Sequence, residues 1–343
     1  SMINPIITHS TKNGNIRKVK NDKIDSKGIA KLGLSKDIPV SQFPAKLVLE
    51  LRSLTRKYYD LTDERSAHIN KLKGDLHTVF PQYLDVFCDV TGKTSTMILR
   101  QYGTPDKILR GHKKTMIEKI SKASRKGLAK ASERYEKLCA AANAAKTFGC
   151  QIDSIYFNIF LTLDLVEKLD SALDSILNRI RQLITFNKNE KFIQQIKLLN
   201  TIPGVGFLTA VTIMCEIGDF SAFRNPKQLF AYFGLDPEVN ESGKFVGTQL
   251  HMSKRGSRIA RRAIFAVALA SIRTKRNGEG INPYLRKYYE LKSGQKPKMV
   301  AIGAVMHKVC NIVFAVLRDE KAFELRSPEE HCKQYQRPAL AAA

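Results

Sequence analysis

The sequence has 343 residues and carries a large surplus of positive charge. Its 57 Lys plus Arg against 32 Asp plus Glu give a formal net charge of +25 at pH 7. This length allows about two domains with hydrophobic cores of their own, and the 43% apolar content excludes a wholly disordered basic chain. Because so much positive charge repels itself unless a polyanion binds it, the leading expected partner is nucleic acid, followed by an anionic membrane surface and then by a ribosome-like structural role.

The sequence predicts neither a membrane-spanning protein nor a disulfide-rich one. No run approaches the roughly 18 apolar residues that a spanning helix needs, and residues 1–20 are polar and lack the apolar stretch of a signal peptide. The cysteines are widely spaced and form no zinc-finger pattern, so we expect buried reduced thiols in a cytoplasmic protein. These cysteines are Cys88, Cys139, Cys150, Cys215, Cys310 and Cys332.

Residues 21–34 (NDKIDSKGIAKLGL) predict a short helix with Asp22 and Asp25 in its first turn. A spacing of three puts both carboxylates on one face of a helix, where they could share a divalent metal ion. Two acids at the start of a helix more often serve as cap and dipole partners. The local pattern alone therefore favours the structural interpretation.

Two later stretches predict a pair of long helices. Apolar residues recur at alternating steps of three and four from Leu47 to Leu72 and again from Ile155 to Leu183. A period of 3.5 residues sustained over this length is typical of a coiled coil. We therefore expect an antiparallel coiled-coil spacer, in which the polar Arg65 and His68 at core positions weaken the contact locally and help to set its register.

The region between these stretches predicts short helices packed as a cap, because Pro81, Gly92, Gly103 and Pro105 interrupt it. Within this region Ser121–Ser132 (SKASRKGLAKAS) combines cations with small side chains. Such a segment could lie along a phosphate backbone, and a solvated helix face explains it equally well.

The segment IPGVGFLTA, residues 202–210, predicts a tight turn between two short helices. Gly204 and Gly206 flank Val205, so backbone N–H groups at the start of the second helix can approach a phosphate without hindrance from side chains. This is the helix-hairpin-helix pattern, which contacts the DNA backbone and not the bases. An ordinary turn between core helices is the alternative.

A polar loop, residues 240–244 (NESGK), follows and contains Ser242 and Lys244. Cations near a loop serine could stabilise its alkoxide, although a Ser-Gly pair in a loop is most often only a turn. The sequence shows no Ser/His/Asp set, P-loop or dinucleotide fingerprint.

The next stretch, residues 251–276, contains eight cations and no acid. Three of the arginines share one face of a predicted helix whose other face is apolar, and a guanidinium can bind two phosphate oxygens. A solvated face usually carries mixed charge, so this single-sign run favours polyanion binding. The cations are Lys254, Arg255, Arg258, Arg261, Arg262, Arg273, Lys275 and Arg276. A final amphipathic helix is predicted over residues 298–318.

Together these stretches resemble one family, the DEDD-type insertion-sequence transposases (insertion-sequence family one-ten), relatives of the Piv site-specific invertases and of bridge-RNA-guided recombinases. The more specific match is LLNTIPGVGFLTAVTIMCEIGDFSAFRNPKQLFAYFGLDPEVNESGKFVGTQLHMSKRGSRIARRAIF, which is similar to the family's transposase domain. INPIITHSTKNGNIRKVKNDKIDSKGIAKL resembles the segment that follows the last strand of the family's RuvC-like domain.

The resemblance implies a recombinase of a mobile genetic element. Its RuvC-like, RNase H-type domain would bind Mg²⁺ or Mn²⁺ through an Asp, a Glu and two further Asp residues, the last two matching Asp22 and Asp25. A serine nucleophile would become joined to DNA while metal polarises the scissile phosphate; Ser242 matches this serine, and Ser253 is the weaker match. The implied partners are DNA, a guide (bridge) RNA and a second copy held through the coiled coil, at the nucleoid in the prokaryotic cytoplasm.

The family's first Asp and its Glu have no counterpart in residues 1–20, which contain no acid. Ser1-Met2 also resembles a cloning remnant, so we expect an N-terminally truncated piece that binds nucleic acid but is inactive. The expected nucleic-acid contacts are Gly204, Val205, Gly206, Lys244 and the eight cations named above. A non-catalytic architectural DNA- or RNA-binding protein is the alternative function.

The expected fold is mainly α with little β structure. Residues 1–42 would be a remnant of the RuvC-like domain, and residues 43–196 the coiled-coil and helical spacer. Residues 197–326 would form the compact helical transposase domain with its helix-hairpin-helix, and residues 327–343 a flexible tail.

Overall fold

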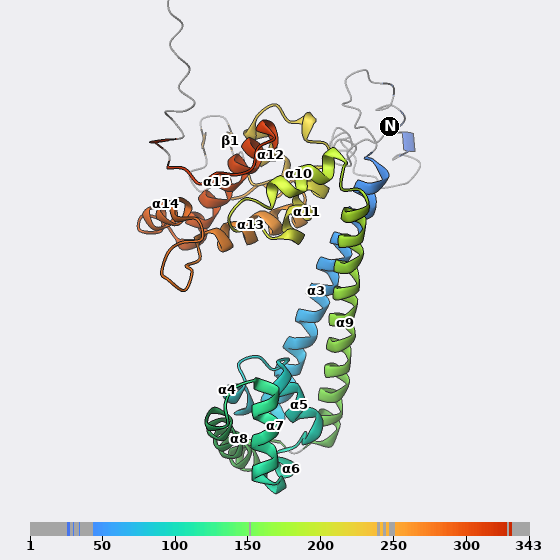
Figure 1. Ribbon diagram of the computed structural model, residues 1–343, viewed down its shortest axis with the longest axis vertical. Helices are drawn as coiled ribbons and strands as arrows, with labels where there is room; N and C mark the ends of the chain where they lie inside the picture. Colours follow the sequence, from blue (N-terminus) through green and yellow to red (C-terminus); the bar gives the residue numbers. More distant parts are fainter. Residues whose placement is uncertain are drawn as a thin grey trace, which may run out of the picture.

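The computed structural model describes residues 26–27, 30, 34, 44–150, 152–238, 241–242, 245–246, 251–327 and 329–330. Two long helices join a small helical cap to a larger helical body (Figure 1). In the described part the only sheet is a two-stranded hairpin. The prediction of a mainly α fold with little β structure is therefore confirmed.

The two long helices are α3 (Lys46–Val79) and α9 (Asp153–Phe186), each with 34 residues. They run antiparallel and side by side, and we call the pair the helical hairpin (Figure 1). At 1.5 Å per residue each helix is about 50 Å long. Every predicted core position of α9 from Ile155 to Leu183 is buried or half-buried, because the 3.5-residue period keeps one face turned to its neighbour.

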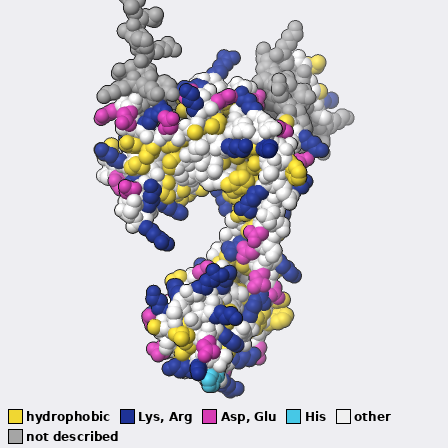
Figure 2. All heavy atoms as spheres, viewed as in Figure 1, with side chains coloured by type: hydrophobic (Ala, Val, Ile, Leu, Met, Phe, Trp, Pro, Cys, Tyr) yellow, Lys and Arg dark blue, Asp and Glu magenta, His cyan; other side chains and the backbone are white. Residues whose placement is uncertain are grey.

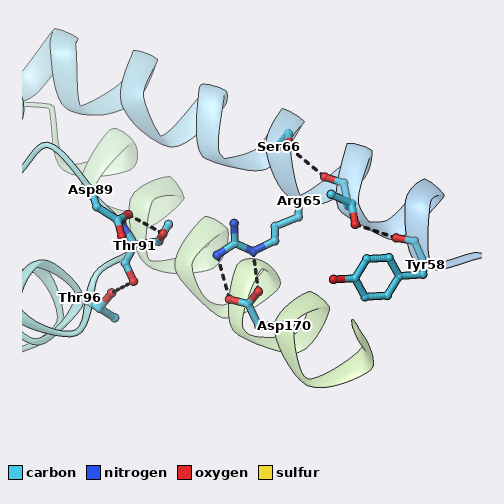
Figure 3. Close-up of polar contacts among 8 residues, drawn as sticks. Tyr58, Arg65, Ser66, Asp89, Thr91, Thr96 and Asp170 are labelled. Atoms are coloured by element: carbon cyan, nitrogen blue, oxygen red, sulfur yellow. Dashed lines mark hydrogen bonds and ion pairs between the residues drawn. The ribbon is translucent and has the colours of Figure 1, made fainter. Parts of the chain in front are cut away.

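A polar pair sets the alignment of these helices near the middle of the hairpin (Figure 3). Arg65 on α3 donates from Nε to Asp170 Oδ1 at 2.5 Å and from Nη2 to Oδ2 at 3.2 Å. Hydrogen bonding to Asp170 is the main reason that the pKa of Arg65 is raised above its ordinary value. Arg65 thus lies between the helices, as predicted, and the half-buried His68 follows one turn later. A bidentate pair of this kind holds one axial position of α3 against α9.

The cap consists of the short helices between α3 and α9 and has a core of its own. Buried residues from the ends of the hairpin, such as Leu76 and Ile159, contribute to this core. Left-handed Gly103 follows α5, and the side chain of Thr104 caps α6, so the predicted breaks fall where helices end. The helices are α4 (Tyr83–Val86), α5 (Lys93–Gln101), α6 (Pro105–Arg110), α7 (Lys113–Ser124) and α8 (Leu128–Phe148).

The body packs around one long apolar helix at the C-terminal side of the chain. Helices α10, α12, α13 and α14 all contact this helix, α15. The bounds are α10 (Lys191–Leu199), α11 (Phe207–Ile217), the 3-10 helix η1 (Phe220–Ala222), α12 (Pro226–Tyr232), β1 (Glu241–Ser242), β2 (Phe245–Val246), α13 (Arg258–Ile272), α14 (Pro283–Ser293) and α15 (Lys298–Asp319).

Helix α15 corrects one expectation from the sequence. Among the described residues it is the one helix that is long and apolar enough to cross a membrane by length and composition, whereas the sequence was expected to contain no such run. Slightly more than half of its apolar window is buried inside the body. Its apolar composition is therefore accounted for by its place at the centre of the core.

The body core continues into one end of the hairpin, where Leu51 of α3 and Ile180 of α9 are fully buried within it. The division of the chain into the four predicted segments stays a prediction. The five described cysteines form no disulfide. Cys215 and Cys310 are buried as expected, and burial raises the pKa of the Cys215 thiol to about 12; Cys88 and Cys150 are exposed, so the expected burial is wrong for them.

Candidate nucleic-acid interface

The predicted helix-hairpin-helix turn lies between α10 and α11. Gly204 has φ +97°, and a Cβ on it would lie 2.5 Å from Ser271 Oγ and 2.9 Å from Ser271 N. Ser271 in turn donates its hydroxyl to Pro203 O at 3.0 Å. Glycine is therefore required here for two reasons, the left-handed backbone and the close approach of α13.

The second glycine of the turn faces open space. Gly206 is exposed, has no atom within 4 Å of an added Cβ, and precedes α11 without a side-chain cap. The first backbone N–H groups of a helix have no partner within the helix and carry partial positive charge. The backbone N–H groups at the start of α11 can therefore donate to a phosphate oxygen, whereas the side chain of the neighbouring Val205 is buried and cannot contact it.

The turn also brings together two stretches that the sequence keeps apart. Ser271, which packs on Gly204, is followed by a tight excursion of the chain over residues 273–281. Lys275 N donates to Glu279 O at 2.7 Å, and Ile281 N donates to Arg273 O at 2.8 Å. The exposed Arg273, Lys275 and Arg276 thereby follow directly on the helix end that contacts the glycine turn.

The predicted polar loop, residues 240–244, belongs to a β-hairpin in the described parts of residues 236–253. Its neck pairs Glu238 N with His251 O and Ser253 N with Asp236 O, both at 2.7 Å. Farther out, Ser242 on β1 pairs with Phe245 on β2. Ser242 therefore lies on this β-hairpin beyond its neck, and the second leg of the neck leads into the stretch that precedes α13.

Two glycines allow the two legs of this β-hairpin to pack closely where they leave the body. Gly234 has φ +66°, and a Cβ on it would lie 2.4 Å from Gly256 N. A Cβ on Gly256 would lie only 2.0 Å from Tyr232 O. The two legs of the hairpin thus cross with backbone against backbone, which no larger residue allows.

Ser253, the second serine candidate, lies in the neck of the hairpin. It is half-buried, and its hydroxyl donates to Asp236 Oδ1 at 2.5 Å. This geometry ties the two legs together and engages the hydroxyl in a strong hydrogen bond to a carboxylate. Ser242, in contrast, lies near the end of the hairpin.

The predicted basic face of α13 is only partly free. Arg262 donates to Asp63 Oδ1 on α3 at 2.7 Å and lies 4.8 Å from the ring centre of Tyr59. Arg258 donates to Asp63 Oδ2 at 3.3 Å with a side chain that is still 83% exposed. Arg261 donates to Gly256 O at 2.7 Å and Phe233 O at 3.2 Å, and burial lowers its pKa.

The other predicted cations of this block, Lys254, Arg255, Arg273, Lys275 and Arg276, are exposed. Within the described residues only Lys275 of these five has a carboxylate within ion-pair distance, Glu279 at 3.8 Å. Lys254 has φ +52°, where the chain leaves the hairpin. These side chains and the start of α11 are the groups best placed to contact phosphates.

Sequence reasoning missed a buried polar cluster that joins α11 to α3. Glu216 is 3% exposed and accepts from Arg56 Nε at 2.9 Å and Nη2 at 3.0 Å. Burial raises the pKa of this carboxyl, but hydrogen bonds from Arg56 and Ser257 outweigh it and hold the pKa below its ordinary value. Nearby, Arg52 Nε donates to Cys215 O at 2.7 Å. A lone acid inside the apolar run FLTAVTIMCEI was the available signal.

Three predicted site residues, Asp22, Asp25 and Lys244, lie outside the described residues. Within the described part, no group of three or more His, Cys, Asp and Glu side chains could hold a metal ion. The assignments of catalytic, metal-binding and nucleic-acid-binding residues therefore stay predictions.

Two family models match the chain, and together they cover just over half of it. The model for the transposase IS116/IS110/IS902 family matches residues 196–290, and a DEDD-type IS110 transposase model matches residues 1–81. The first covers the predicted helix-hairpin-helix turn, the β-hairpin that contains Ser242 (the serine hairpin) and α13. The second covers Asp22, Asp25 and α3.

Curated relatives agree with these matches. An insertion element IS110 protein of Streptomyces coelicolor is 23% identical over 82% of this chain and 66% of its own length. The pilin gene-inverting protein of Moraxella bovis is 30% identical over 51% of this chain and 52% of its own. An insertion element IS116 protein of Streptomyces clavuligerus is 24% identical over 90% and 74%.

The chain thus spans between about half and three quarters of the length of these relatives. The two matched ranges include the two segments on which the resemblance was based, residues 3–32 and 198–265. On this basis the chain belongs to the IS110 family of DEDD-type insertion-sequence transposases.

Proposed function

We propose that this sequence serves in DNA transposition or site-specific recombination, in which DNA is cut and rejoined through Ser242; the expected inactivity of residues 1–343 on their own stays a prediction. The observation that supports this proposal is the β-hairpin whose strand pair contains Ser242 and whose second leg leads into the exposed Lys254 and Arg255 before α13. Positive groups around a serine stabilise the negative charge that develops on phosphorus and oxygen during phosphoryl transfer.

The hydrogen bond that engages the Ser253 hydroxyl supports Ser242 as the proposed nucleophile. In the proposed step the Ser242 hydroxyl loses its proton, its oxygen bonds to phosphorus, and the bond from phosphorus to one DNA oxygen breaks. That oxygen leaves as a DNA hydroxyl, and a later attack by a DNA hydroxyl frees the serine and rejoins the strands. Ser253 instead holds Asp236 and with it the neck of the hairpin.

Asp22 and Asp25 are the proposed metal ligands from this chain. Carboxylate oxygens suit a hard cation such as Mg²⁺ or Mn²⁺, and the described residues that follow, Ser26 and Lys27, are helical. A helix places carboxylates three residues apart on one face. A metal ion bound there would polarise the scissile phosphate and offset its charge.

We propose DNA as substrate, a guide RNA as a second nucleic-acid partner, and a homodimer formed through the helical hairpin. Support for the dimer is a stripe of exposed apolar side chains on α9: Phe157, Leu161 and Leu165, which are 61%, 46% and 43% exposed. Their spacing of four places them on one face, and apolar surface of this kind marks contact sites. Such an enzyme would act at the nucleoid in the cytoplasm.

The test measures the rejoining of DNA ends in cells. The cells receive the coding region together with the genomic DNA that flanks it. Ser242→Ala is expected to reduce joined-end products more than about 100-fold, in line with loss of a nucleophile, whereas Ser253→Ala reduces them less than about tenfold. A denaturing gel should show a covalent protein–DNA species that Ser242→Ala lacks.

Two outcomes would contradict the proposal. If Ser253→Ala and not Ser242→Ala removes the covalent species, the nucleophile is wrongly assigned. If the wild-type protein binds DNA but yields neither joined ends nor a covalent species, the non-catalytic architectural role replaces the enzymatic one.

A further inference from the structure

A second basic surface lies on the cap, at the far end of the hairpin from the body (Figure 1). Residues 119–132 of α7, the following turn and α8 contain five cations and no acid. All five are exposed, and in the described part of the chain none has a carboxylate within ion-pair distance. They are Lys119, Lys122, Arg125, Lys126 and Lys130.

The turn between α7 and α8 holds two of these cations in a fixed conformation. Arg125 has φ +53° and ψ +27°, a left-handed conformation that non-glycine residues seldom adopt. Ser121 Oγ donates to Lys126 O at 2.9 Å, and Lys126 N donates to Ser124 Oγ at 3.3 Å. Local hydrogen bonds therefore define the backbone from which Arg125 and Lys126 project.

The neighbouring surface leaves room for an extended ligand. Between α7 and α8 lies a hollow of about 390 Å³, lined by Ile117 and Leu128 among others, with Glu118 as its acid. Gly127, in the turn, has no atom within 4 Å of an added Cβ. Small residues beside cations let a phosphate backbone approach, and the apolar lining suits sugars or bases.

The buried side of α7 argues against a membrane as the partner. Its apolar residues Met116 and Ile120 are fully buried in the cap core, so the helix has no broad apolar face to insert into lipid. Figure 2 shows the molecule hollowed between cap and body, with Lys and Arg side chains on both. A polyanion that contacts the body can thus continue to the cap.

We infer that the α7–α8 surface of the cap is a second binding site for the phosphate backbone of a nucleic acid, remote from the serine hairpin. The inference rests on the proposed function for the identity of the polyanion. Each cation that neutralises a phosphate releases a bound counterion, so the salt dependence of binding counts such contacts. The helical hairpin of α3 and α9, about 50 Å long, separates this surface of the cap from the phosphate contacts of the body.

The test compares two variants of the full chain that lose the same charge. The cap variant carries Lys122→Gln, Arg125→Gln, Lys126→Gln and Lys130→Gln. The matched control changes four exposed lysines on the helical hairpin: Lys57→Gln, Lys71→Gln, Lys73→Gln and Lys168→Gln. Circular dichroism and thermal unfolding establish that both variants keep the fold. Binding is measured at several salt concentrations with a DNA duplex and with a hairpin RNA.

The cap variant is expected to bind at least about tenfold more weakly at moderate salt. Its slope of log binding constant against log salt concentration should be smaller by about 2 to 4, while the control changes that slope by less than about 1. The probe that shows the loss, DNA or RNA, identifies the ligand. Equal slopes for both variants would overturn the inference, as would a loss of binding to vesicles with anionic lipid in place of nucleic acid.

A third variant separates this inference from the proposed function. It changes the body cations Lys254→Gln, Arg255→Gln, Arg273→Gln and Arg276→Gln. If it loses binding while the cap variant does not, only the inference about the cap fails. If wild-type protein binds neither probe, the proposed function fails and the cap site with it.

Discussion

The body and the cap each contain a run of cations without an acid, yet the two runs are used differently. In the body, Arg258 and Arg262 contact Asp63 and Arg261 donates to backbone carbonyls. In the cap, none of the five cations of residues 119–132 has a carboxylate within ion-pair distance in the described part of the chain. Charge in the sequence therefore predicts a basic region, and the partners supplied by the fold decide which cations remain available to a ligand.

The largest loss of stability is expected on removal of Arg261, a body cation that is held by hydrogen bonds to the backbone of the fold. Arg261→Ala removes two hydrogen bonds to the carbonyls of Phe233 and Gly256, at the root of the serine hairpin. Hydrogen bonds from a charged donor contribute about 1.5 to 3 kcal/mol, so we expect the free energy of unfolding to fall by about 2 kcal/mol. Urea unfolding followed by circular dichroism measures this loss.

The matched control for this change is Arg255→Ala, which removes the same charge from an exposed neighbour. It should alter the free energy of unfolding by less than about 0.5 kcal/mol. If the two variants lose equal stability, then Arg261 is held no more firmly than a surface cation, and the contrast between engaged and free cations fails.

A smaller effect, with a dependence on pH, is expected at the buried cluster between α11 and α3. The pKa of Glu216 lies below its ordinary value of 4.5, so ionised Glu216 stabilises the fold above that pH. This contribution is lost as the pH falls through the lowered value in the folded state. Glu216→Gln should therefore show a shallower loss of stability with acid below about pH 4.5 than the wild type.

The control for this change is Glu50→Gln on α3, which lies near the surface and pairs only weakly with Lys46 at 3.9 Å. Its acid unfolding should follow the wild type. Parallel acid unfolding of the wild type and Glu216→Gln would mean that the Arg56 pair does not stabilise the ionised carboxyl.

The elements set by local patterns could be predicted from the sequence. The heptad spacing indicated α3 and α9 because burial of one helix face imposes a repeat. The glycines of IPGVG indicated the turn at Gly204 because few other residues adopt its backbone. In both cases the physical cause lies within a few residues of the signal.

The partners of the polar side chains could not be predicted in this way. Asp63 and Arg262 are 199 positions apart, and Arg56 and Glu216 are 160 apart, so no local spacing connects them. The tie between Ser253 and Asp236 depends on a chain crossing at Gly256. Pairings of this kind follow from tertiary packing; they engage the Ser253 hydroxyl and decide which arginines of α13 remain available to a ligand.

The smallest effect, a modest gain in affinity for DNA, is expected when the ion pairs that hold Arg258 and Arg262 are removed. Asp63→Asn removes the carboxylate that pairs with Arg258 and Arg262 and raises the net charge by one. Exposed pairs contribute about 0.2 to 1 kcal/mol, so stability should change little. Two arginines become available to phosphates, so affinity for a DNA duplex should rise about two- to fivefold. The slope of the logarithm of the binding constant against the logarithm of the salt concentration should steepen by about 1. Asp60→Asn, on the same helix and also exposed, adds the same charge without releasing Arg258 or Arg262 and should raise affinity by less than about twofold. If both variants bind alike, the gain comes from net charge alone, and the contact with Asp63 does not restrain the arginines of α13.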